Sequence, residues 1–575
     1  MKKLLLIILL PIITFAQKPA ETLNKIIKDY EDFEKKENEN KPSDSLGTGI
    51  LGHNSLADIE RRAGYYEKIV AQLSKINLAT LSQSNQINLE LLKYKCQSEV
   101  DDFKYNTHLI NLLNDSGFHM SYGGSMRNAN PKTFANYKTY LQKLQDFPRS
   151  VTEQIELMRE GIRKGITQAK VIFDGYEATY NIYIVKTPEE SEFFTPFTKI
   201  PDNIDQKTKE KLIEEGKKAV MEAVRGYQLF SDFMKNEYLP AARTKEGISV
   251  LPNGANYYQM LVKNFTTLPM TVAEVHQKGL DEVARIRAEM EVVIKKTDFK
   301  GSFKEFLQFL RTDPQFYAKT PLELLKEASY ISKQIDGVLP AFFDKLPRQP
   351  YGVEPVPAAI APKYTGGRYS GASPESHRAG HYWVNTYNLP SRSLYNLEAL
   401  TLHEAVPGHH LQIALNYEIP NTPKFRKNFY ISAYGEGWAL YCEYLGEEMG
   451  FYKSPYSKFG QLTYEMWRAC RLVVDTGIHA YGWNRQQAID YLTNNTALSI
   501  HECTTETDRY ISWPGQALSY KIGELKIREL RKKAEKALGE KFNIRNFHDA
   551  VLSEGTLTLP LLEKVIDAYI LKNKK

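Results

Sequence analysis

Apolar residues recur every three or four positions along most of this chain, with charged residues between them. The first segment shows this spacing at Leu23, Ile26, Ile27, Tyr30 and Phe33. Because an α-helix turns once in about 3.6 residues, the spacing gathers apolar side chains on one helix face. The rhythm runs to about residue 237 and returns from Thr271 to Ile294, with a capping box at Thr271 and Glu274. The pattern predicts a mainly α-helical protein.

One stretch breaks this rhythm. Residues 350–378 are rich in Pro, Gly, Ser and Tyr and predict a long loop. The next segment, His381–Tyr387, is rich in aromatic and β-branched residues and predicts a strand. Because side chains alternate along a strand, Asn385 and Tyr387 are expected on the same face.

The composition limits the possible functions only weakly. The chain has 575 residues, of which 42% are hydrophobic and 25% charged, an ordinary balance for a globular protein. The formal net charge is +6, and the basic residues are scattered apart from a modest cluster at 528–533. We interpret that cluster as a solvated helix face and expect no nucleic-acid partner. We expect one large helical unit at residues 17–575, with an N-terminal helical lobe at about 20–245.

The four cysteines show no metal-binding spacing. Cys96, Cys442, Cys470 and Cys503 lie far apart and form no C-x-x-C pair. A disulfide among the last three and buried free thiols both stay open as alternatives.

The first 16 residues have the pattern of a secretory signal peptide. Two lysines precede an apolar run from Leu4 to Phe15, and Thr14 and Ala16 provide the small residues before a cleavage point. The run is too short to span a membrane. We therefore expect an exported protein, periplasmic or extracellular, without stable membrane insertion after cleavage. No cysteine lies near the cut, so we expect no lipid anchor there.

The chemistry is concentrated in residues 401–410, which read T-L-H-E-A-V-P-G-H-H. In zinc hydrolases with H-E-x-x-H, two histidines one turn apart bind zinc and the Glu activates a water. Here Pro407 takes the place of the second histidine. In a regular helix His409 would point about 120° away from His403, and His410 would lie about 10 Å further along. A bulge at Pro407 and Gly408 would bring His409 beside His403.

This bulge makes His403 and His409 the predicted zinc ligands and Glu404 the predicted base. His410 then supports the site from behind, although an exchange of His409 and His410 stays open. The best third ligand is Glu436, in Y-G-E-G-W, on a second helix. Glu443 lies two turns further along on the same face and is expected to hold a ligand from behind. The flanking glycines would let another backbone approach closely.

These motifs together resemble the bacterial family catalogued as domain of unknown function 885. The resemblance rests on L-H-E-A-V-P-G-H-H-L-Q, on Y-G-E-G-W-A-L-Y-C-E, and on Arg509-Tyr510 with W-P-G-Q-A-L-S-Y-K-I-G from Trp513. It also includes L-P-N-G at residues 251–254 and V-N-T-Y at residues 384–387. The family looks like a remote relative of the gluzincin metallopeptidases, which include angiotensin-converting enzyme, thimet oligopeptidase and thermostable carboxypeptidases.

The resemblance implies a fold and further site residues. It implies two helical lobes with a deep central cleft, a small sheet beside the zinc helix and a zinc-binding core at about 380–525. It implies that His381–Tyr387 is an edge strand that pairs with the substrate backbone, with Asn385 and Tyr387 as substrate-binding residues; an ordinary internal strand is the alternative. The oxyanion donor would be Tyr520, then Tyr510 or His501. Arg509 and Gln516 would contact substrate, Arg509 by pairing with a carboxylate.

Asp475 and His479 lie one helical turn apart on a long predicted helix. They could support the zinc site as a pair, or His479 could line the cleft and bind substrate; a satisfied core pair is the alternative.

The sequence therefore predicts an exported zinc metallopeptidase that hydrolyses short peptides, the substrate class being implied by the resemblance alone. A zinc amidase of a cell-wall or small-molecule substrate and a non-catalytic periplasmic binding protein are the rival hypotheses. The oligomeric state stays open.

Overall fold

A computed structural model describes residues 13–37, 50–358, 360–373 and 376–574 of the chain. Most of these residues are helical, which confirms the predicted class. Most of the predicted signal peptide, residues 1–12, lies outside the described residues. Within the described ranges, no helix combines the length and apolar character needed to cross a bilayer.

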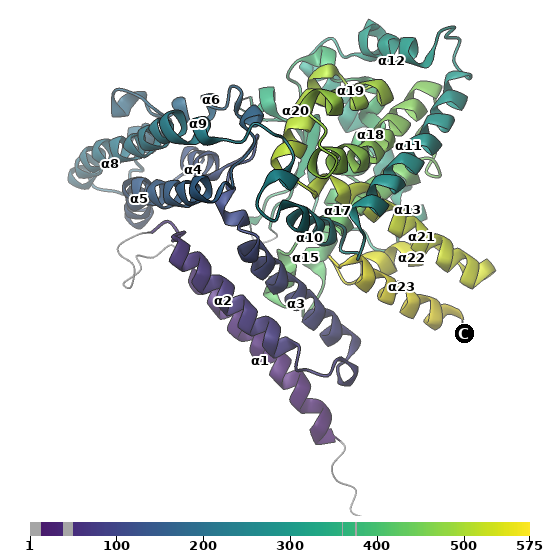
Figure 1. The fold of residues 1–575 in the computed structure, drawn as a ribbon, viewed down its shortest axis with the longest axis horizontal. Helices are drawn as coiled ribbons and strands as arrows, with labels where there is room; N and C mark the ends of the chain where they lie inside the picture. Colours follow the sequence, from purple (N-terminus) through teal and green to yellow (C-terminus); the bar gives the residue numbers. More distant parts are fainter. Residues whose placement is uncertain (1–12, 38–49, 359, 374–375, 575) are drawn as a thin grey trace, which may run out of the picture.

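The described residues of the N-terminal half form helices, with isolated β-bridges and turns between them. Its helices are α1 Ile13–Glu37, α2 Leu56–Leu73, α3 Gln83–Lys104, α4 Phe118–Arg127, α5 Phe134–Lys164, α6 Ala178–Asn181, α7 Thr195–Thr198, α8 Gln206–Phe233, α9 Leu239–Ala241, α10 Gly254–Thr266 and α11 Val272–Ile294. Figure 1 shows α1, α2 and α3 extending along one side, with α4 to α9 gathered beyond them. Thr271 caps α11 in a capping box with Glu274, as predicted.

The C-terminal half continues with helices around a small sheet. Its helices are α12 Phe303–Thr312, α13 Pro321–Phe342, α14 Leu397–Glu404, α15 His409–Glu418, α16 Lys424–Lys427, α17 Ser432–Leu445, α18 Pro455–His479, α19 Arg485–Asn495, α20 Ile500–Ser512, α21 Ser519–Leu538, α22 Ile544–Leu552 and α23 Leu559–Lys574. Helix α18 lies at the centre, and nearly every residue from Ser457 to His479 is buried. Helix α11 packs along α18, and α17 packs along α21.

The sheet has three strands, β1 Tyr351–Pro355, β2 Gly367–Ser370 and β3 Gly380–Val384, in the order β1-β3-β2. Strand β3 pairs in parallel with β1 and antiparallel with β2. The prediction that this segment is an edge strand is wrong, because neighbours occupy both of its hydrogen-bonding sides. The edge that lies beside α14 belongs to β2.

Helices α17 and α21 touch backbone to backbone through two glycines. A Cβ on Gly437 would lie 2.5 Å from the Cα of Gly523, and one on Gly523 would lie 1.9 Å from the Ala433 carbonyl oxygen. This confirms the predicted close approach beside Glu436. The contact brings Glu436 of α17 and Tyr520 of α21 to the same cavity.

All four cysteines are buried free thiols, so the disulfide alternative does not hold in this structure.

We expect Gly523→Ala to lower the free energy of unfolding by about 1–3 kcal/mol, because the added methyl group pushes α21 away from Ala433. Urea denaturation measures the change. Gly337→Ala in α13 is the control, since Gly337 is exposed and its added Cβ would meet nothing within 4 Å. That substitution should raise stability by up to about 1 kcal/mol, because alanine favours a helix. Equal effects of the two would contradict this account of the contact.

Candidate metal centre

The two histidines come together because the chain interrupts its helix between them. Helix α14 ends at Glu404 and α15 begins at His409, and a cis Val406–Pro407 peptide bond lies between the two helices. The prediction of a bulge within one continuous helix is therefore wrong, because two separate helices carry the two histidines. Pro407 cannot donate a backbone hydrogen bond, and Ala405 leaves helical geometry with ψ at −108°. A Cβ on Gly408 would lie 1.8 Å from the His403 carbonyl oxygen, so only glycine fits this return.

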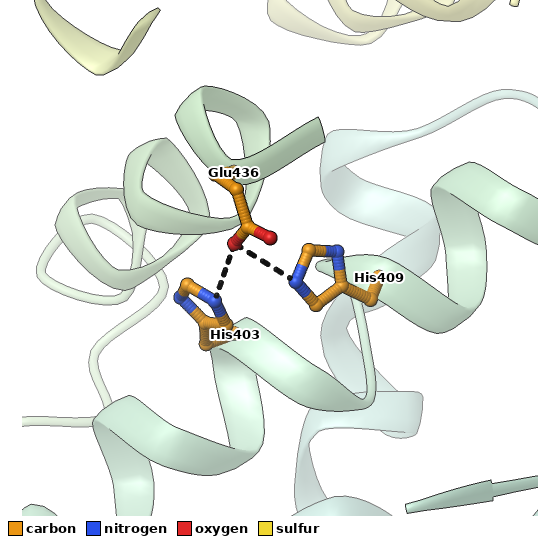
Figure 2. A group of neighbouring side chains, drawn as sticks. All are labelled: His403, His409 and Glu436. Carbon is orange, nitrogen blue, oxygen red and sulfur yellow. Dashed lines mark ion pairs between the residues drawn. The ribbon is translucent and has the colours of Figure 1, made fainter. Parts of the chain in front are cut away.

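His403, His409 and Glu436 form one compact group (Figure 2). The Nε2 atoms of His403 and His409 lie 3.5 Å and 3.3 Å from Oε2 of Glu436. The ligand atoms of all three residues lie within 4.8 Å of one another. Donors about 2.0–2.2 Å from a tetrahedral zinc ion are separated by about 3.3–3.6 Å. Two imidazoles and one carboxylate at these spacings suit a divalent cation such as zinc and leave a fourth position open.

The electrostatics of the group also suit a cation. Burial raises the pKa of Glu436, but His409 and His403 lower it well below its ordinary value. Burial lowers the pKa of His403, yet hydrogen bonds to Glu436 and Glu443 raise it to about 10. Nδ1 of His409 is buried without a hydrogen-bond partner among the described residues. The surroundings of His403 and Glu436 thus favour positive charge at this point, which suits a bound cation.

Glu443 holds His403 from behind and is itself held in place. Oε1 of Glu443 lies 2.7 Å from Nδ1 of His403, so this carboxylate orients the ring with Nε2 toward Glu436. Glu443 is fully buried, and the guanidinium group of Arg468 pairs with it at 3.3 Å. Trp438 ties the same helix to the helix break, since its Nε1 donates to the Pro407 carbonyl oxygen at 2.9 Å.

The group opens into a cavity of about 640 Å³. Glu404 lines it, and its Oε2 accepts a hydrogen bond of 2.8 Å from the backbone N–H of Tyr369 in β2. This contact fixes one carboxylate oxygen of Glu404 in the cavity that His403 and His409 also line. A carboxylate in this position can accept a proton from a water held between it and a metal.

Tyr520 lines the same cavity, and its ring centroid lies 6.5 Å from that of His403. Burial and Glu436 raise the pKa of Tyr520, but Arg509, Arg471 and a hydrogen bond with Gln516 bring it below its ordinary value. Arg509 donates to Oε1 of Gln516 at 3.0 Å, and its Nη2 lies 3.5 Å from the Tyr520 hydroxyl. The structure thus places Tyr520, Arg509 and Gln516 on one wall of the cavity.

His410 lies apart from the three-residue group. Its Nδ1 lies 2.9 Å from the Tyr369 hydroxyl, and its ring centroid is 4.7 Å from that of Tyr351. Burial lowers the pKa of His410 to about 4. The geometry therefore selects His409, and not His410, as the partner of His403.

Two of the predicted oxyanion donors do not line the cavity. Tyr510 is buried, and its hydroxyl accepts hydrogen bonds of 2.8 Å from both Trp467 Nε1 and Arg471 Nε. His501 is exposed in the first turn of α20. Sequence could not place these side chains, because the helical phase of α20 relative to α21 is set by packing.

Asn385 and Tyr387 do not have the predicted substrate-binding position either. Both lie beyond the end of β3. The Nδ2 of Asn385 donates to the carbonyl oxygens of Ala361, Tyr364 and Thr365, and its Oδ1 accepts from Tyr387 N–H. Asn385 is therefore a buried residue that holds the loop before β2 in place, because an amide can form hydrogen bonds with several backbone groups at once. Tyr387 is exposed and does not line the cavity.

Asp475 and His479 are satisfied separately, so the predicted pair does not form. Asp475 accepts hydrogen bonds from the Tyr258 hydroxyl and from the backbone N–H of Gly515 at 3.1 Å. Burial raises the pKa of Asp475 to about 7. Nε2 of His479 donates to the Tyr510 carbonyl oxygen at 2.9 Å, and burial lowers the pKa of its imidazole to about 3. Neither residue lines the cavity.

Some residues of the site carry no sequence signal. The Tyr430 hydroxyl donates to Oε1 of Glu436 at 3.0 Å, and Arg368 and Arg468 line the cavity. None of them belongs to a motif with a characteristic spacing. Tyr430 lies six residues before Glu436, where only the turn into α17 brings its hydroxyl back to the carboxylate.

A family model described as "Bacterial protein of unknown function (DUF885)" matches residues 43–566. The chain belongs to this family. A crystal structure of a protein from Colwellia psychrerythraea, described as a candidate lipoprotein, is 27% identical with a TM-score of 0.84 and covers 97% of this chain and 99% of that chain. A structure from Shewanella oneidensis, described as a candidate lipoprotein of unknown function, is 18% identical with a TM-score of 0.67.

The Shewanella oneidensis structure covers 95% of this chain and 99% of that chain, and its likeness shows the fold alone. No curated protein matches this chain. Family membership thus confirms the resemblance of the sequence motifs to this family, while the family's own description assigns no activity.

We expect Arg468→Met to lower the free energy of unfolding of the metal-free protein by about 3 kcal/mol, because it removes one of the two groups, Arg468 and His403, that pair with the buried Glu443. Urea denaturation after chelation measures this. Arg225→Met is the control. Arg225 likewise pairs with a glutamate, Glu222, at 2.7 Å, but this pair lies within one helix and both side chains are well exposed. Its effect should stay within about 0.5 kcal/mol. A loss below about 1 kcal/mol for Arg468→Met would contradict the predicted support of Glu443.

Proposed function

We propose that this protein is a zinc-dependent metallopeptidase that hydrolyses short peptides. The observation that carries the proposal is the convergence of His403, His409 and Glu436 within 4.8 Å, at the wall of a cavity that also contains Glu404 and Tyr520. Two imidazoles, one carboxylate and an adjacent free carboxylate are the parts that a zinc hydrolase needs. A binding protein would have no need of Glu404, which disfavours the non-catalytic hypothesis.

When bound, zinc would polarise the peptide carbonyl group and make a water in its open position more acidic. Glu404 takes a proton from the attacking water and passes it to the leaving amine. The Tyr520 hydroxyl donates a hydrogen bond to the developing oxyanion, aided by the guanidinium groups that lower its pKa. Tyr430 holds the second oxygen of Glu436, which keeps the ligand set in place.

The substrate backbone would pair with β2, the edge strand, in place of β3. The Tyr369 N–H points away from β3 to Glu404, whereas the Gly366 carbonyl oxygen accepts from Asn385 N–H. Because backbone groups alternate along a strand, the N–H and C=O of Gly367 face the cavity side. An extended peptide can add to such an edge. This arrangement would correspond to the two-lobed cleft of a gluzincin-like peptidase.

We further propose that the protein is exported or resides in the cell envelope. The pattern of residues 1–16 supports this, and so does the description of the Colwellia psychrerythraea and Shewanella oneidensis proteins as candidate lipoproteins.

We expect elemental analysis to find about one zinc ion per chain in the wild type and in His410→Ala. His403→Ala, His409→Ala and Glu436→Ala should each lose it, because two ligands hold zinc much more weakly than three. His410→Ala is the matched control, since it removes the neighbouring imidazole that contacts Tyr369. Zinc retained by His409→Ala but lost by His410→Ala would reverse the ligand assignment. No zinc in any sample after zinc was supplied would refute the proposed cofactor.

Glu404→Gln should retain the zinc ion and lose at least about 100-fold in kcat on a mixture of short peptides, because the amide cannot accept the proton. Product formation followed by mass spectrometry measures this, with metal content determined on the same sample. The binding-protein hypothesis predicts no hydrolysis by either form. An amidase would hydrolyse cell-wall fragments or small amides instead, so both substrate classes belong in the assay.

A further inference from the structure

The cavity wall beside Tyr520 carries more positive than negative charge. Arg471 and Arg509 share one carboxylate, Glu506, with N–O distances of 2.9 Å and 3.5 Å. Arg471 is only 1% exposed, and its Nη1 has no hydrogen-bond partner in the described part of the chain. The buried Arg471 and the half-buried Arg509 therefore share one carboxylate, which leaves a net positive charge where charge is costly to bury.

A third guanidinium group approaches from another element. Arg368, in edge strand β2, lines the same cavity and forms no ion pair with a carboxylate of the described residues. Burial and Arg509 lower the pKa of Arg368, but Tyr364, Tyr520 and Glu404 raise it above its ordinary value overall. Arg368 and Arg509 line the same cavity, so both guanidinium groups can act on a single anion there.

Three other carboxylates that line the cavity are engaged elsewhere. Glu502 pairs with Arg392 at 3.4 Å. Glu404 accepts from the Tyr369 N–H, and Glu436 lies between the two histidines. Asp102 lines the cavity but forms no ion pair with an arginine of the described residues. Glu506 is divided between Arg471 and Arg509, and Arg368 has no carboxylate partner in the described ranges, so this wall keeps an excess of positive charge that an anionic group of the substrate would balance.

The position of this wall relative to the metal group limits how far the anionic group of a peptide substrate can be from the bond that is cleaved. The Tyr520 ring centroid lies 6.5 Å from the His403 ring and 4.3 Å from the Arg471 guanidinium carbon, and the Arg509 Nη2 is 3.5 Å from the Tyr520 hydroxyl. One extended residue spans about 3.3–3.6 Å. Tyr520 therefore lies beside both the metal group and Arg509, so a peptide whose scissile bond is at the metal group would reach Arg509 with a C-terminal segment of only about one or two residues.

We propose that Arg509 and Arg368 bind the C-terminal carboxylate of the substrate, and that the protein removes one or two residues from peptide C-termini. Water adds across the peptide bond, so the shortened peptide gains a carboxylate and the released residue or dipeptide gains an amino group. Arg471 holds Arg509 in place through Glu506 and makes no contact with substrate. Planar guanidinium groups suit a carboxylate because they offer two parallel N–H donors. This inference rests on the proposed peptidase function.

The test compares a tetrapeptide mixture with randomised positions and free C-termini with the same mixture amidated at the C-terminus. For the zinc-loaded wild type, kcat/KM should fall about 100-fold on amidation, as expected for the loss of a buried charge pair. Arg509→Gln and Arg368→Gln should lose most of this difference by cleaving the free acids more slowly, with little change on the amides. Mass spectrometry should find only single residues or dipeptides released from the C-terminus.

Arg225→Gln is the matched control, since it removes one arginine from an exposed helix face and should keep the full difference. Arg368 is exposed at the cavity, so its variant is expected to fold even if Arg509→Gln does not; metal content and thermal unfolding check both. A second measurement titrates tetra-alanine and tetra-alanine amide into zinc-loaded Glu404→Gln, where the free acid should bind at least about 10-fold more tightly.

Each outcome has a distinct meaning. Equal cleavage of acids and amides, or release of fragments longer than two residues, overturns the carboxylate anchor and leaves the peptidase function standing. Efficient cleavage of amides that end in Asp or Glu assigns the two arginines to an acidic side chain instead and also overturns it. No cleavage of either mixture by the zinc-loaded wild type refutes the peptidase function, and the anchor falls with it.

Discussion

The metal centre depends on one backbone constraint, which is that the helix must stop after Glu404 and restart at His409. Pro407 enforces the stop because it has no N–H to donate, and Gly408 allows the return because its missing side chain leaves room for the His403 carbonyl oxygen. The Trp438 indole N–H then holds the Pro407 carbonyl oxygen. Trp438 lies in α17, the helix that carries Glu436, so a single contact ties the histidine pair to the third donor of the group.

The central helix α18 supplies the support for both parts of the cavity. Arg468 pairs with the carboxylate that orients His403, and Arg471, nearly one turn further on, pairs with the carboxylate shared with Arg509. A helix buried on all sides normally carries apolar residues. Here the buried arginines and acids are retained with partners, because an unpaired charge at these positions would cost several kcal/mol, about 3–5 in typical cases. The metal group and the positive wall are therefore both supported by side chains of α18.

Two residues that the sequence singled out beside the motifs belong to the scaffold and not to the chemistry. Asp475 holds the Gly515 turn, and His479 holds the backbone of Tyr510. These bonds fix the segment that contains Arg509, Gln516 and Tyr520, whose side chains reach the cavity. Polar residues near the motifs thus position the site as well as line it. In the proposed division of the cavity, the metal group lies at one point and the carboxylate-binding wall lies about one or two residues of substrate away from it.

The sequence by itself determined the helical class, the family and the helix cap at Thr271, and it predicted a group of His403, Glu436 and one of the two histidines 409 and 410, because each depends on local spacing or on a motif. It also indicated that the glycines around Glu436 serve a close approach. Only the tertiary structure decided that His409 is the histidine beside His403, that β3 is internal and that β2 is the edge strand beside α14, since these depend on backbone geometry and long-range pairing. It likewise decided that Tyr510, His479 and Asn385 face inward, because the rotation of one helix or strand against another is set by packing that no local pattern records. The positive wall formed by Arg368 and Arg509 was likewise decided by the tertiary structure alone. Its two residues lie 141 positions apart and reach the same cavity only when β2 and α20 come together around it.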